Sequence, residues 1–113
     1  MSKNKIFYKW NVPKTVEDIV RAICADYDRR AIAIQSMSED SLIKNKYKEI
    51  NLLIDSAIED IEAPIRRVML EDIFNGRGYD RSPASYMISR RPYYARKHKI
   101  IHDIALKLNL ISE

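Results

Sequence analysis

The chain has 113 residues, of which 46% are hydrophobic and 32% are charged, and this composition excludes a disordered chain. One cysteine, Cys24, excludes an internal disulfide framework and predicts a reducing, cytoplasmic setting. Because the sequence has neither an apolar run of about 18 residues nor a signal-peptide pattern, we expect no membrane association and no secretion.

Charge is distributed unevenly along the chain. Residues 1–76 carry 12 Lys and Arg against 13 Asp and Glu, whereas residues 77–113 carry 8 against 3. The net charge of +4 therefore combines −1 from the first part with +5 from the second. This asymmetry favours a polyanionic partner for the C-terminal third, and a solvated basic surface is the alternative.

The first 36 residues are expected to form an arm and one helix. Thr15 is a natural N-cap, and apolar residues at helical spacing predict that the helix ends near Ser36. The arm covers residues 1–12, and its aromatic side chains are expected to dock on the core: Phe7, Tyr8 and Trp10.

A second helix is predicted to begin at Ser38 or Ser41 and to end near residue 62. Its apolar residues are spaced as in a heptad repeat: Ile43, Tyr47, Ile50, Ile54, Ala57 and Ile61. The spacing predicts that this helix packs on the first in a helical hairpin covering residues 13–62. A homodimer seam along the same stripe is the alternative.

Proline and glycine mark the next boundaries. Pro64 is suited to open a third helix, and Gly76 after Asn75 closes it in the left-handed conformation. Ser82-Pro83 predicts a short fourth helix through about residue 87, and Ser89 is expected to cap a long fifth helix. The expected fold is all-α, with a helix-turn-helix unit in residues 63–113 after the hairpin.

The fifth helix carries the predicted DNA contacts, because the second helix of a helix-turn-helix enters the major groove by its N-terminal end. The expected base-edge contacts are Arg90, Arg91, Tyr94 and Lys97. The expected phosphate contacts are Arg81, Ser89, Arg96, His98 and Lys99. Cations in the first turn of a helix oppose its dipole, so a pair of arginines there indicates a functional site.

These residues carry a resemblance to a known family. The strongest part is Ile88-Ser89-Arg90-Arg91-Pro92-Tyr93-Tyr94, followed by Lys97 to Ile101 and by Ile104, Ala105 and Leu108. Together with residues 54–58 and 66–73, this segment resembles phage late-gene transcriptional regulators of the RinA and ArpU types. The C-terminal unit of these regulators is similar to region 4 of sigma factors. The match covers about residues 51–112, and Pro92 departs from the small polar residue usual there.

The resemblance implies a function. It implies promoter DNA as the ligand, bacterial RNA polymerase as a second partner and activation of phage or prophage late genes near the host nucleoid. Two alternatives remain at this point. One is a small terminase subunit, a packaging adaptor that forms rings through helical hairpins. The other is a helical adaptor that binds a host protein through its acidic N-terminal half.

Other candidate sites are weaker. Gly76-Arg77-Gly78 lacks the third glycine of a dinucleotide loop, and His98 and His102 lack a third zinc ligand. Glu71 and Asp72 are expected on a solvated helix face, and a contact of either with the polymerase is the alternative. Because no nucleophile, base and orienting group can be assembled, we expect no catalysis, no cofactor and no metal.

Overall fold

All regular structure in residues 10–112, the part that the computed structural model describes, is helical. The helices are α2 (Lys14–Ala25), α3 (Tyr27–Ser36), α4 (Leu42–Ile58), α5 (Ala63–Asn75) and α6 (Arg90–Lys107), with short 3₁₀ turns η2 (Tyr79–Arg81) and η3 (Pro83–Tyr86). The all-α prediction is confirmed for these residues. None of these helices is both long and apolar enough to cross a bilayer. Most of the predicted arm, including Phe7 and Tyr8, lies outside the described residues.

The predicted single helix from Thr15 to Ser36 is wrong, because the chain breaks it at Asp26. This residue has φ −93° and ψ 5° and separates α2 from α3. The predicted cap at Thr15 is also wrong, since α2 begins at Lys14 with Pro13 in the N-cap position. The apolar pattern continues across the break, but α2 and α3 pack against different parts of the molecule.

A buried arginine stabilises the break. Arg30 is only 3% exposed, and its guanidinium donates to the Ile23 carbonyl (2.6 Å) and to Asn51 Oδ1 of α4 (2.7 Å). Asn51 in turn donates to the Tyr27 carbonyl at 3.2 Å. Backbone groups beside the break therefore gain partners from Arg30 and α4, as buried polar groups require.

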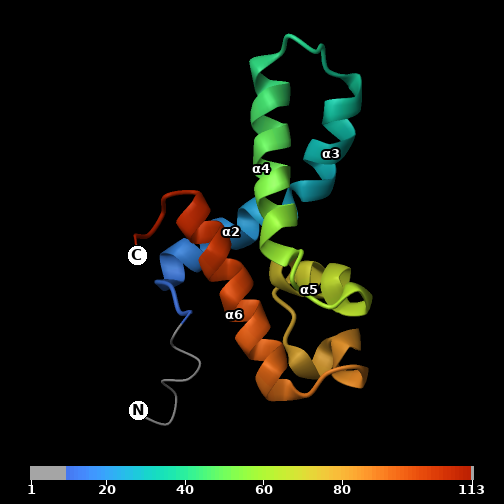
Figure 1. Cartoon of the computed structure of the whole chain (residues 1–113), viewed down its shortest axis with the longest axis vertical. Helices are drawn as coiled ribbons and strands as arrows, with labels where there is room; N and C mark the ends of the chain where they lie inside the picture. Colours follow the sequence, from blue (N-terminus) through green and yellow to red (C-terminus); the bar gives the residue numbers. More distant parts are fainter. Residues whose placement is uncertain (1–9, 113) are drawn as a thin grey trace.

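The break divides the helices between two parts of the molecule (Figure 1). α3 runs antiparallel to α4, with Tyr27 bonded to Asp55 near one end and Arg29 bonded to Tyr47 further along. These two helices project as a hairpin, whereas α2 packs against α5 and α6. Only the second half of the predicted first helix therefore contacts α4 as a hairpin partner.

The core lies where α2, α5 and α6 meet the C-terminal half of α4. Its fully buried members include Val20, Ile54, Met69, Tyr93 and Ile104. The predicted heptad stripe of α4 is buried only in part. Ile54, Ala57 and Ile61 belong to the core, Tyr47 and Ile50 are partly exposed, and Ile43 is 57% exposed.

Several predicted boundaries are confirmed. Ser41 caps α4 by accepting from the Lys44 amide, and Ser82 caps η3 by accepting from the Ala84 amide. Gly76 follows α5 at φ 67°, in the left-handed region that favours glycine. Ser89 occupies the N-cap position of α6, but its side chain makes no capping hydrogen bond, so that part of the prediction is wrong.

Candidate nucleic-acid interface

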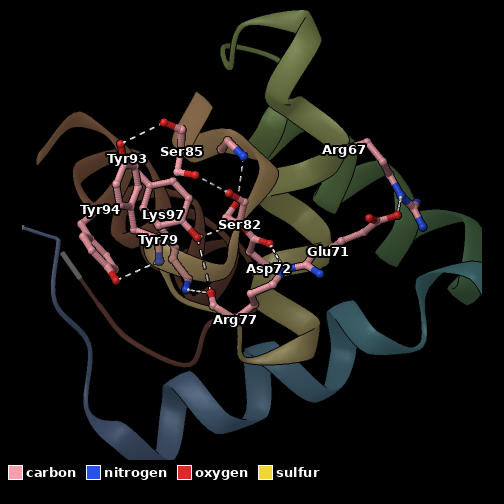
Figure 2. Close-up of polar contacts among 11 residues, drawn as sticks. Arg67, Glu71, Asp72, Arg77, Tyr79, Ser82, Ser85, Tyr93, Tyr94 and Lys97 are labelled. Carbon is pink, nitrogen blue, oxygen red and sulfur yellow. Dashed lines mark hydrogen bonds and ion pairs between the residues drawn. The ribbon is translucent and has the colours of Figure 1, made fainter. Parts of the chain in front are cut away.

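The connecting loop (residues 76–89) is fixed to the start of α6 by tyrosines (Figure 2). The Tyr79 amide donates to the Tyr94 hydroxyl at 3.1 Å, and the Tyr79 hydroxyl donates to the Ile88 carbonyl at 2.7 Å. The Tyr79 and Tyr93 rings meet edge to face, with centroids 5.2 Å apart. The loop contains only short 3₁₀ turns, so these side chains set its shape.

Asp72 of α5 lies beneath this loop and is fully buried, so its predicted place on a solvated face is wrong. Its carboxylate accepts from the Tyr93 hydroxyl (2.7 Å) and from Arg77 Nε (2.5 Å). The hydrogen bond to Asp72 raises the pKa of Arg77, while burial and the same carboxylate raise the pKa of Tyr93. Asp72 therefore ties α5, the connecting loop and α6 together.

Lys97 does not point outward as predicted. It follows Tyr93 by four residues and precedes Ile100 by three, which places it on the buried face of α6. Its ammonium donates to the Arg77 carbonyl at 2.7 Å and lies over the Tyr93 and Tyr94 rings. Burial lowers the pKa of Lys97. Its contacts are those of a residue that positions the loop.

Tyr94 and His98 also lie closer to the interior than predicted. Both are partly buried, and their rings stack with centroids 6.2 Å apart. The Tyr94 hydroxyl reaches back to the connecting loop, so it does not project from the helix end. Burial lowers the pKa of the His98 imidazole, which favours its neutral form.

Three of the predicted cations form ion pairs. Arg90 pairs with Asp80 and lies over the Tyr79 ring at 5.0 Å. Arg96 makes a two-pronged contact with Glu62, at 2.9 and 2.7 Å. Lys99 bonds Asp103 at 2.8 Å and lies over the Trp10 ring. These pairs reduce the net positive potential that the sequence predicts for the sides of α6.

Four of the predicted residues gather at the N-terminal end of α6. Arg81, Ser89, Arg90 and Arg91 are all exposed, and the Arg90 contact with Asp80 brings η2 to this end of the helix. An open groove of about 480 Å³ lies beside them and is lined by residues 75–81 and Tyr94. We call the exposed residues Arg81, Tyr86, Met87, Ser89, Arg90 and Arg91 the basic tip.

Tyr86 and Met87 are the members of the basic tip that sequence reasoning missed. Tyr86 is 92% exposed and Met87 is 51% exposed. A tyrosine just before the turn that leads into a basic helix was the available signal. Its hydroxyl is suited to donate to a phosphate, and its ring is suited to contact sugar or base edges.

The lone cysteine and the two histidines are the remaining candidates for reactive or metal-binding side chains. Burial raises the pKa of the Cys24 thiol to about 12, so this cysteine stays protonated and is a poor nucleophile. Among residues 10–112, no three His, Cys, Asp or Glu side chains gather as metal ligands do. His102 instead packs its ring edge to face against Trp10.

The basic tip thus combines exposed guanidinium groups, a tyrosine hydroxyl and a helix start, held on a loop that buried side chains fix. Comparisons with family models, curated proteins and solved structures found no match to this chain.

Proposed function

We propose that the protein binds double-stranded DNA in a sequence-specific way and that the first turn of α6 enters the major groove. In this proposal η3, the turn at residues 87–89 and α6 act as a helix-turn-helix unit. The proposal extends to transcription activation with bacterial RNA polymerase as a second partner, which the resemblance to late-gene regulators supports.

One observation carries the proposal: the exposed first turn of α6 holds Arg90 and Arg91 and has no acidic residue. The positive end of the helix dipole disfavours cations there by roughly 0.3–1 kcal/mol each. In the free protein Asp80 of η2 offsets part of this cost by pairing with Arg90. Phosphates and guanine acceptors would offset it more fully, because guanidinium groups bond both in a two-pronged manner.

Burial revises the roles of the predicted contact residues. We assign base reading to Arg90 and Arg91, and phosphate contacts to Arg81, Tyr86 and Ser89 of the same exposed end. The side chains that reach inward position the loop and the helix: Tyr94, Lys97 and His98. Arg96 and Lys99 lie further along α6, where they attract the DNA backbone but do not contact base edges.

The test is whether the basic tip reads sequence. We expect selection from random duplexes to yield a preferred site, on which Arg91→Ala and Arg90→Ala each lose affinity by about 5- to 150-fold. Each substitution should also relax the preference at one base position. Electrophoretic mobility shifts on the selected site and on a scrambled duplex measure both effects.

Lys99→Ala is the matched control, because Lys99 is an exposed cation of the same helix. It should weaken binding to both duplexes alike and reduce the slope of log affinity against log salt by about 0.9. If all three variants lose the same affinity on both duplexes, α6 attracts DNA without reading it, and the sequence-specific proposal is wrong.

Asp80 provides a second prediction. Asp80→Asn should tighten binding to any duplex by about two- to fivefold, because it removes an exposed ion pair and a carboxylate close to the phosphates. Fluorescence anisotropy with a labelled duplex measures the change, and Asp103→Asn, which releases Lys99 further along α6, is the comparison and should tighten binding less. Weaker binding by the Asp80 variant would contradict this prediction and show that the carboxylate orients Arg90 for reading.

A ring-forming packaging adaptor is the second candidate function. The observation that favours it is uncovered apolar surface on α4, where Leu42 is 84% exposed and Ile43 is 57% exposed. Such surface favours self-association, and a closed ring would be evident from the mass of the protein in solution.

A further inference from the structure

The outer face of α4 carries apolar side chains that α3 does not cover. Leu42 is 84% exposed and Ile43 57%, and Ile50 and Leu53 are partly exposed. The contacts of α4 with α3 run along a different line, through Lys44, Tyr47, Asn51 and Asp55. At about 100° per residue, Leu42 and Leu53 lie opposite that line, with Ile43 and Ile50 beside them.

The break at Asp26 explains why this face is open. Because α2 turns away to pack on α5 and α6, α3 is the described helix that accompanies the N-terminal half of α4 (Figure 1). The core covers the C-terminal half of α4, where Ile54 and Ala57 are buried. One apolar stripe thus begins in the core and continues outward along the projecting hairpin. We call residues Leu42, Ile43, Lys46, Glu49, Ile50 and Leu53 the outer α4 face.

We propose that the outer α4 face binds the same face of a second copy of this chain, with the two α4 helices antiparallel about a two-fold axis. The charges on this face suit that arrangement. Lys46 lies within the apolar stripe and Glu49 at its edge, with side chains 65% and 68% exposed, and within one chain the two pair with each other at 3.6 Å. In an antiparallel pair centred between them, each Lys46 faces Glu49 of the other copy, so both contacts are attractive.

A second copy fits this face better than an unrelated surface. An isologous interface needs a patch that complements itself, and one lysine beside one glutamate on an apolar stripe meets that need. A parallel pair would instead place like charges opposite each other. A lysine within an otherwise apolar helix seam is also a known means of fixing register and the number of chains.

The mass in solution tests the proposal. The chain mass is 13.3 kDa, and sedimentation equilibrium should give twice this value for the unaltered protein. Ile43→Asp should return the mass to that of a single chain, because it places a carboxylate in the apolar seam. Leu52→Asp is the matched control: Leu52 is 67% exposed on the same helix but lies about 180° from Ile43, so this variant should remain a dimer.

A charge exchange tests the geometry without altering the apolar residues. Lys46→Glu alone and Glu49→Lys alone each place like charges opposite each other, and each should weaken the dimer by about tenfold. Mixing the two single variants should restore tight association, because the introduced glutamate of one chain then faces the introduced lysine of the other. Circular dichroism of each variant confirms that the helices remain folded.

Three results would overturn the proposal. The first is a single-chain mass for the unaltered protein across the concentration range, and the second is a ring of many chains. The third is a dimer that withstands Ile43→Asp or that the mixed charge variants fail to restore. Loss of the dimer in Leu52→Asp would likewise place the interface on another face of α4.

Discussion

Ile54→Asp should strongly destabilise the fold and lower its melting temperature. Ile54 is fully buried where α4 enters the core, so the new carboxylate would lose its water without gaining a partner. We expect a cost of more than about 4 kcal/mol, a large share of the roughly 5–15 kcal/mol that stabilises a typical domain. Circular dichroism at 222 nm during thermal unfolding measures this loss.

Leu52→Asp serves as the control for this prediction as well. Leu52 lies two residues away on α4 and is 67% exposed, so its replacement should change the free energy of unfolding by no more than about 0.5 kcal/mol. Equal melting temperatures for the Ile54 variant and the unaltered protein would contradict the placement of this stripe in the core.

Arg30→Met should produce the second large loss of stability. The substitution keeps the approximate length of the side chain but removes the donors that serve the Ile23 carbonyl and Asn51. Asn51 Oδ1 would lose its donor at a cost of about 1–3 kcal/mol, and the Ile23 carbonyl would keep only the Asp26 amide at 3.3 Å, so we expect a total near 3 kcal/mol. The melting temperature should fall by about 10–20 °C.

Arg30→Lys is the informative comparison. A lysine keeps the charge, but its compact ammonium group cannot replace a guanidinium that donates to two acceptors from different helices. The melting temperature of Arg30→Lys should lie between those of the unaltered protein and of Arg30→Met. A methionine variant as stable as the unaltered protein would show that apolar packing alone maintains the break at Asp26.

Local signals predicted part of the fold correctly. The caps at Ser41 and Ser82 and the left-handed Gly76 follow from groups a few residues apart, and the structure confirms them. The break at Asp26 has no proline or glycine to announce it. It depends on contacts between Arg30 and Asn51, which are 21 residues apart, so the helical pattern alone favoured one long helix.

The candidate site was predictable to a similar degree. Exposure of Arg90 and Arg91 follows from their place in the first turn of α6. The spacing of Lys97 from Tyr93 indicated that its side chain points inward. Its charge nevertheless favoured the prediction that it lies on the surface. The pairing of Arg96 with Glu62 was not predictable, because 34 residues separate the partners and only the packed fold brings them together.

The tyrosine contacts of the connecting loop have a consequence for the thermodynamics of binding. A loop without long helices would ordinarily lose conformational entropy when a ligand orders it. Here the side chains of Tyr79, Tyr93 and Tyr94 already join it to α5 and α6 before any ligand arrives. Much of that entropy is lost during folding, so the basic tip is preorganised and more of each new contact contributes to affinity.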